Sequence, residues 1–103
     1  MPKSTIMSGG LRALDTNVST TSCYFYGATL YSNGGSSTMS LTVYDSADDV
    51  TGGKTELAYI KIDAGDHFGG YLPSFPIRAS FGLRCETIGS SGTYITYYGS
   101  PSL

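Results

Sequence analysis

Apolar and polar residues alternate with a period of two along residues 39–44, 58–63 and 77–86. Within each stretch, the apolar residues fall on one face of an extended chain. This alternation predicts β-strands that bury one face and leave the other to solvent or to a partner. The predicted core face consists of Met39, Leu41, Val43, Ala58, Ile60, Ile62, Ile77, Ala79, Phe81 and Leu83.

Two further stretches are rich in aromatic and β-branched residues, which favour strands. Residues 20–32 predict one long strand, or two strands broken at Gly27, where a β-bulge is the usual reason for an interior glycine. Residues 93–98 predict the last strand of the chain. Pro73 and Pro76 each lack a backbone donor, so the segment that holds them is expected to be an edge or a crossing between sheets.

Turn-forming residues separate the predicted strands at a spacing of about ten residues. Asn33-Gly34-Gly35-Ser36 is expected to close a β-hairpin, because Asn and Gly adopt positive φ easily. No helical segment lies between the strands, so the pattern predicts an all-β fold, an antiparallel β-sandwich of the jelly-roll or immunoglobulin-like kind. Residues 1–17 are expected to form an N-terminal arm or edge strand, and residues 18–103 a single sandwich domain.

Charge is low throughout the chain: 14% of the 103 residues are charged, and the formal net charge is -2. The 6 basic residues are scattered, whereas a nucleic-acid site needs several on one face. No stretch approaches the roughly 20 apolar residues that a membrane span requires. We therefore expect neither nucleic acid nor membrane as a partner.

Candidate chemistry is sparse, and the sequence predicts no enzyme, no catalytic residue and no cofactor. His67 is the only histidine, and no nucleophile motif accompanies it. Cys23 and Cys85 are expected to be reduced, buried thiols, although a disulfide between them is an alternative. Asp45, Asp48 and Asp49 offer oxygen ligands of the kind that calcium prefers, but Asp is also a favoured turn residue, so no metal site is predicted.

The 9 tyrosines are the one compositional excess with functional meaning. Tyrosine can stabilise a sheet through cross-strand pairs, or it can serve as a rigid, amphipathic contact for another protein or for a carbohydrate. Several tyrosines fall opposite the predicted core face. The candidate interface residues are Tyr24, Tyr26, Tyr44, Tyr59, Tyr94 and Tyr98.

A series of short segments resembles small virion proteins of tailed bacteriophages, over roughly residues 20–99. The segments, in order, are Leu41-Thr42-Val43-Tyr44-Asp45, a Gly-Gly turn, Leu57-Ala58-Tyr59-Ile60-Lys61, Ala64-Gly65, Pro76-Ile77-Arg78, Gly82-Leu83 and Tyr94-Ile95-Thr96-Tyr97-Tyr98-Gly99.

This resemblance implies a capsid decoration or cement protein, a β-sandwich that stabilises the phage head by binding across capsomers. The implied partners are the major capsid protein and further copies of the chain, as a homotrimer. The implied location is the capsid surface of the virion, after synthesis in the host cytoplasm. A head-fibre, tail or spike component and a carbohydrate-binding sandwich are the alternatives.

Overall fold

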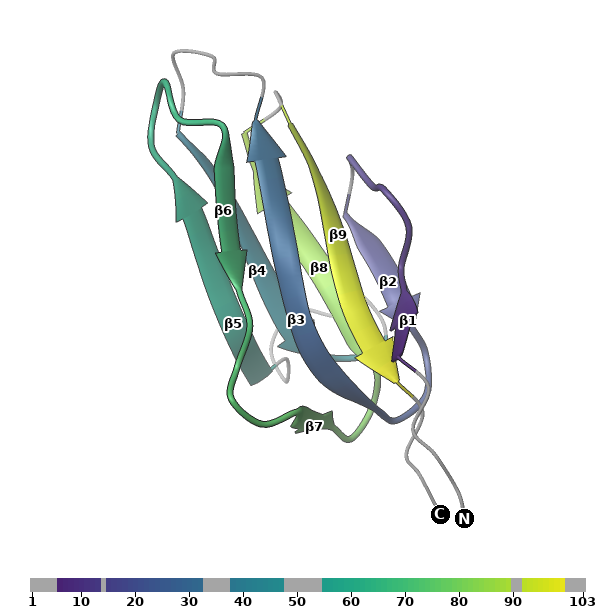
Figure 1. The fold of residues 1–103 in the computed structure, drawn as a ribbon. Coiled ribbons are helices and arrows are strands. Elements are labelled where there is room, and N and C mark those ends of the chain that lie inside the picture. Colours follow the sequence, from purple (N-terminus) through teal and green to yellow (C-terminus); the bar gives the residue numbers. More distant parts are fainter. Residues whose placement is uncertain (1–5, 14, 33–37, 48–54, 90–91, 100–103) are drawn as a thin grey trace.

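Strands are the only regular elements in the computed structural model, which describes residues 6–13, 15–32, 38–47, 55–89 and 92–99 (Figure 1). These residues contain no helix that could span a bilayer. In chain order, the strands are β1 (Ile6–Ser8), β2 (Thr16–Ser19), β3 (Cys23–Ser32), β4 (Met39–Asp45), β5 (Thr55–Ile62), β6 (Phe68–Tyr71), β7 (Ile77–Ala79), β8 (Leu83–Ile88) and β9 (Gly92–Gly99).

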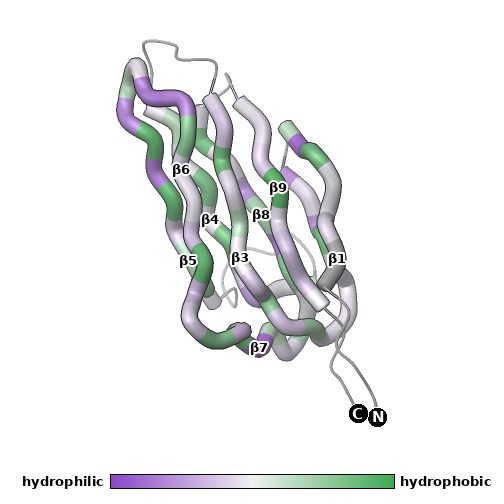
Figure 2. Tube along the Cα trace, viewed as in Figure 1, coloured by the Kyte–Doolittle hydropathy of each residue, from purple (hydrophilic) through white to green (hydrophobic). Residues whose placement is uncertain are grey.

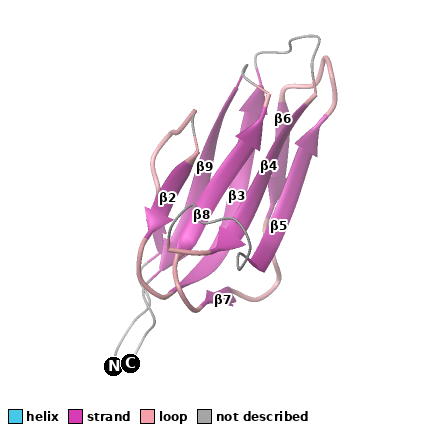
Figure 3. Cartoon of the chain, turned by 180° about the vertical axis from the view of Figure 1, so that it is seen from behind, coloured by secondary structure: helices cyan, strands magenta, loops and turns pink. Residues whose placement is uncertain are grey.

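The strands form two antiparallel sheets, packed face to face (Figures 1 and 3). Sheet A has the order β1-β9-β3-β6, with β7 also paired to β3, and sheet B has the order β2-β8-β4-β5. The pairs β1·β9, β2·β8, β3·β6 and β4·β5 are therefore nested along the chain, and alternate between the sheets. This is the strand order of a jelly roll. The predicted antiparallel β-sandwich is confirmed, and the nested order selects the jelly roll from the two alternatives.

The core lies between the sheets, and β4 and β5 supply its most regular part. Alternate residues in the second half of β5 are buried, and hydropathy alternates along the same stretch (Figure 2). The predicted core face is correct for nine residues, of which Ile77 is only half-buried and packs against the others. Further buried apolar residues are Cys23, Phe25, Ala28, Leu30, Cys85 and Tyr94.

The tenth predicted core residue, Phe81, is 67% exposed, so that prediction is wrong. Residues 77–86 do not form one strand, because the chain leaves sheet A after β7 and enters sheet B at β8. Gly82 lies in this crossing at φ 157°, and a Cβ there would approach the carbonyl oxygen of Ser19 to 2.5 Å. The crossing interrupts the alternation and turns Phe81 outward.

β3 is a single strand with a bulge, which confirms one of the two predictions for residues 20–32. The register with β9 shifts between Phe25 and Gly27, so Tyr26 is the extra residue. Gly27 is required here, because its φ is 148° and a Cβ would lie 2.7 Å from the carbonyl oxygen of Tyr71.

Turn composition indicates where strands end, but it does not indicate which sheet follows. β3 and β4 lie in different sheets, so the predicted hairpin at residues 33–36 is wrong; these residues themselves lie outside the described ranges. The segment with the two prolines begins with β6, an edge strand of sheet A. The boundary expected after residue 17 falls inside β2, and β1 and β2 are edge strands of the sandwich itself.

Candidate interaction surface

The outer faces of the two sheets differ in their chemistry. Cross-strand pairing with β3, in which Phe25, Ala28 and Leu30 are buried, fixes the outward residues of sheet A. We call this surface the aromatic face, and it consists of Tyr24, Thr29, Tyr31, Phe68, Arg78, Thr93, Ile95 and Tyr97. Arg78 is the one charged residue among them.

Cross-strand pairs order the side chains of the aromatic face. Tyr31 pairs with Phe68, and their ring centroids lie 5.4 Å apart. Tyr24 pairs with Arg78, whose guanidinium carbon lies 5.8 Å from the centroid of the Tyr24 ring. The single charge of this face therefore lies over an aromatic ring.

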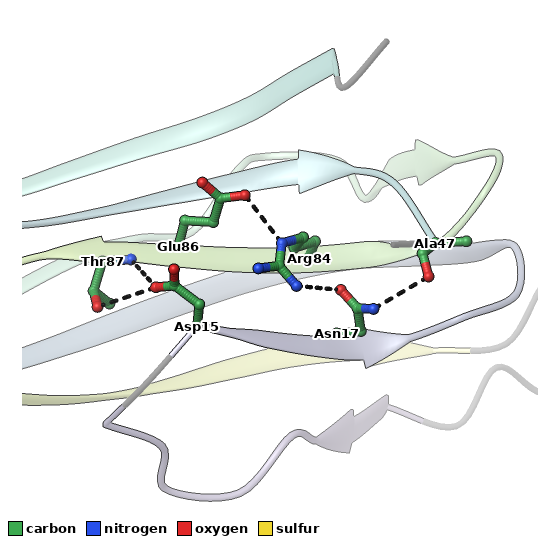
Figure 4. Close-up of polar contacts among 6 residues, drawn as sticks. All are labelled: Asp15, Asn17, Ala47, Arg84, Glu86 and Thr87. Carbon is green, nitrogen blue, oxygen red and sulfur yellow. Dashed lines mark hydrogen bonds and ion pairs between the residues drawn. The ribbon is translucent and has the colours of Figure 1, made fainter. Parts of the chain in front are cut away.

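The outer face of sheet B carries charges of both signs. Arg84 on β8 is the centre of a polar network, in which its Nε donates to Glu86 Oε2 at 3.0 Å and its Nη1 donates to Asn17 Oδ1 at 2.8 Å (Figure 4). Asn17 Nδ2 donates in turn to the carbonyl oxygen of Ala47 at 3.2 Å. This network joins β2, β8 and the segment that follows β4, and it places charges of both signs on the outer face of sheet B.

The six predicted interface tyrosines do not share one surface. Tyr24 lies on the aromatic face, and Tyr26 lies in the bulge of β3. Tyr44 and Tyr59 lie on the outer face of sheet B, where they pair with Glu56 and Thr42.

The remaining two predicted interface residues point inward. Tyr94 is fully buried, so the prediction that it contacts a partner is wrong. Burial raises the pKa of the Tyr94 phenol, partly offset by a hydrogen bond with Thr16. Tyr98 is half-buried, pairs with Phe25 and packs against the core.

Tyr31, Phe68 and Tyr97 are the aromatic residues of this face that sequence reasoning missed. The phase of β9 depends on its register with β3, and the bulge at Gly27 shifts that register. A period-two reading of Tyr94-Ile95-Thr96-Tyr97-Tyr98 does not indicate which residues face the core. Gly27 signals the bulge in the sequence, but it indicates only which residues of β3 face the core, and not which residues of β9 do so.

The residues considered for chemistry have structural roles in the described part of the chain. His67 is exposed, and its Nδ1 lies 3.3 Å from the carbonyl oxygen of Ser32. Cys23 and Cys85 are free, buried thiols, one in each sheet, as predicted. Burial raises the pKa of the Cys85 thiol to about 12, and it also raises the pKa of Cys23.

Asp45, the first residue of the loop considered for calcium, uses both carboxylate oxygens within the fold. Its Oδ2 accepts a hydrogen bond from the Ser80 N–H at 2.9 Å, and its Oδ1 accepts one from the Phe81 N–H at 2.8 Å. Asp48 and Asp49 lie outside the described residues. The described part of the chain contains no cluster of three potential metal ligands.

Comparison of the chain with family models, curated proteins and solved structures finds no match in any of the three.

Proposed function

We propose that the chain is a structural virion protein of a tailed bacteriophage, which decorates the capsid and binds the major capsid protein through the aromatic face. Its role is mechanical: many copies, each making a modest contact across capsomer boundaries, stabilise the head. The proposal requires no catalytic residue and no cofactor.

The observation that carries the proposal is the composition of the aromatic face. Interface cores are depleted in charged residues and enriched in aromatic ones. This face has four aromatic rings and one charge, and that charge lies over Tyr24. The outer face of sheet B also carries Tyr44 and Tyr59, but it differs by its four charged residues, Glu56, Lys61, Arg84 and Glu86.

The identity of the partner rests on the sequence resemblance to small phage virion proteins. The matching segments include most of β4, the middle of β5 and most of β9. The jelly-roll strand order agrees with this role, because viral capsid domains commonly use that architecture, although lectins use it as well.

The direct test is mass spectrometry of purified virions made from the genome that encodes this chain. We expect the chain in the virion at a fixed ratio to the major capsid protein, and immunogold labelling over the head. Absence from the virion would overturn the proposal. Labelling confined to the tail or to fibres would favour the alternative structural role.

A binding experiment tests the face. Recombinant chain is added to capsids that lack it, and sedimented protein is measured. We expect Tyr31→Ser with Phe68→Ser to abolish binding, and Ile88→Ser, on the outer face of sheet B, to retain it, although Ile88 is 73% exposed. Equal binding by both variants would contradict the use of this face. Binding to a glycan array that the double substitution removes would instead favour a carbohydrate-binding module.

A further inference from the structure

Two strand edges on one side of the sandwich have no partner among the described residues. Within these residues, β5 pairs only with β4 and β6 only with β3, so each has an open edge on the same side (Figures 1 and 3). β5 has 8 residues, whereas β6 has 4, and on the opposite side β1 and β2 have 3 and 4. Among the described strands, β5 therefore presents the longest unpaired edge.

The interior behind this edge is already filled. Gly69 of β6 lies against the inward side chains of β5, and a Cβ at Gly69 would be 3.1 Å from Ile62 Cγ1 and 3.2 Å from Ile60 Cγ2. No further side chain is needed to close the core here. A Cβ at Gly69 would also lie 3.6 Å from the Lys61 carbonyl oxygen, but no described strand pairs with the outer edge of β5. An open strand edge selects another extended backbone segment.

The second half of β5 is complementary to itself. Ala58, Ile60 and Ile62 are buried, whereas Tyr59 and Lys61 are exposed, so this half alternates without interruption. In an antiparallel pair related by a two-fold axis at Ile60, Ile60 faces Ile60 of the second copy, and Ala58 faces Ile62. Lys61 then faces Tyr59 of the second copy. Each inward residue meets an inward residue, and each outward residue meets an outward one.

Other registers match less well. An axis one residue earlier, at Tyr59, would place Lys61 within the paired strands opposite Leu57, which packs against the core. The axis at Ile60 instead places opposite Leu57 a residue beyond the end of β5, Asp63. An axis at Lys61 would place two lysines directly opposite each other, which is unfavourable. A lysine on an edge strand ordinarily discourages pairing. With the axis at Ile60, however, it meets an aromatic ring, which attracts a cation.

We infer that two copies of the chain associate through β5, in antiparallel register about Ile60, and join their B sheets into one continuous sheet. Lys61 is free to take part, because its present partner is Asp63, at 3.6 Å and largely exposed. The inference stands apart from the proposed function, because the aromatic face belongs to the other sheet. Pairing of like edges requires a two-fold axis, and therefore favours a dimer over the trimer that the resemblance implies.

The first experiment is light scattering of the full chain across a concentration series. We expect twice the 10.9 kDa mass of one chain at high concentration, with dissociation on dilution. A monomer at every concentration, or a trimer, would overturn the inference.

The second experiment tests the register by charge exchange. Tyr59→Lys places lysine opposite Lys61 at two symmetric positions, and we expect dimerisation to weaken about tenfold or more. Adding Lys61→Glu to that variant makes both pairs attractive, and the dimer should return. Ile88→Lys places a lysine at an exposed position on the same outer face but away from the edge, and it should leave the dimer intact.

The outcomes are separable from loss of folding and from loss of capsid binding. Circular dichroism of Tyr59→Lys shows whether the single variant is folded, and recovery of the dimer by the second substitution shows that the loss came from the lysine pair and not from the change at residue 59 as such. A Tyr59→Lys chain that still dimerises, or a double variant that does not, contradicts the Ile60 register. If monomeric Tyr59→Lys still binds capsids, capsid binding does not require the dimer. The proposed function would then stand without it.

Discussion

Asp45 holds the backbone of Phe81: its Oδ1 accepts a hydrogen bond from the Phe81 N–H at 2.8 Å, across 36 residues of sequence. The same carboxylate accepts from Ser80 and Gly82, at 2.9 and 3.4 Å. The end of β4 thus fixes the crossing between β7 and β8, and the crossing presents a phenylalanine to solvent.

Replacing Asp45 tests this arrangement. We expect Asp45→Ala to lower the free energy of unfolding by about 1–2 kcal/mol, because three N–H donors lose a charged acceptor while water can reach the exposed ones. Urea denaturation measures the loss. Asp63→Ala, which removes only an exposed carboxylate near Lys61, should change stability by less than about 0.5 kcal/mol. Equal effects of the two substitutions would contradict the role of Asp45.

Gly82 and Gly65 separate backbone strain from steric clash. Both have positive φ, 157° and 88°, but a Cβ at Gly65 meets open space, whereas one at Gly82 lies 2.5 Å from the Ser19 oxygen. We expect Gly65→Ala to cost about 1 kcal/mol and Gly82→Ala more than about 2 kcal/mol. Thermal unfolding of the two variants makes the comparison. Similar costs would mean that the crossing can move to accept a side chain.

Arg84 and Lys61 form ion pairs of different burial, so their removal should have different effects. Arg84 is largely buried and bonds both Glu86 and Asn17, whereas the pair of Lys61 with Asp63 is largely exposed. At a concentration at which the chain is monomeric, we expect Arg84→Ala to lower the free energy of unfolding by about 1–2 kcal/mol, and Lys61→Ala to change it by less than about 0.5 kcal/mol. Urea denaturation at two salt concentrations measures both, and an equal loss would contradict the structural role of the Arg84 network.

The buried thiols should resist alkylation in the folded chain. Burial raises the pKa of Cys85 to about 12, and the thiolate is the reactive form. We expect neither cysteine to react with iodoacetamide at pH 8 without denaturant, and both to react in urea, as counted by mass spectrometry. Rapid labelling of Cys85 in the native chain would contradict its burial.

The raised pKa of the Cys85 thiol makes the stability of the fold depend on pH. Its pKa in the folded chain, about 12, lies above its ordinary value of 9.0, so the unfolded chain loses this proton first. The stability that the protonated Cys85 thiol contributes is complete below pH 9. It is lost as pH rises toward 12, at about 1.4 kcal/mol of unfolding free energy per pH unit. The difference in unfolding free energy between the native chain and Cys85→Ala isolates this slope, and a difference that stays constant with pH would contradict it.

Sequence pattern predicted the strands of this fold better than the arrangement of its faces. β4 and β5 are predictable because each alternates without a break, and hydrophobic burial requires only that one face be apolar. The alternation of residues 77–86 assigns Phe81 to the core. Asp45, distant in sequence, and Gly82, at positive φ, hold the crossing in a conformation that turns Phe81 outward instead. Tyr94 and Tyr97 are both candidates for an interface on composition alone. Only the register of β9 with the bulged β3 shows that Tyr94 faces the core and Tyr97 the outer surface. Long-range pairing decides these cases, and local pattern carries no information about it.

The nested strand order also constrains the synthesis of the protein. β9 lies between β1 and β3 in sheet A, and yet it follows every other described strand in the sequence. Until residue 99 has been translated, β1 has no neighbour and the inward face of β3 lacks Tyr94 and Tyr98 beside it. Folding of sheet A on the ribosome therefore cannot finish before β9, one of its two inner strands, emerges, and a nascent chain halted before β9 would leave apolar surface of β3 uncovered.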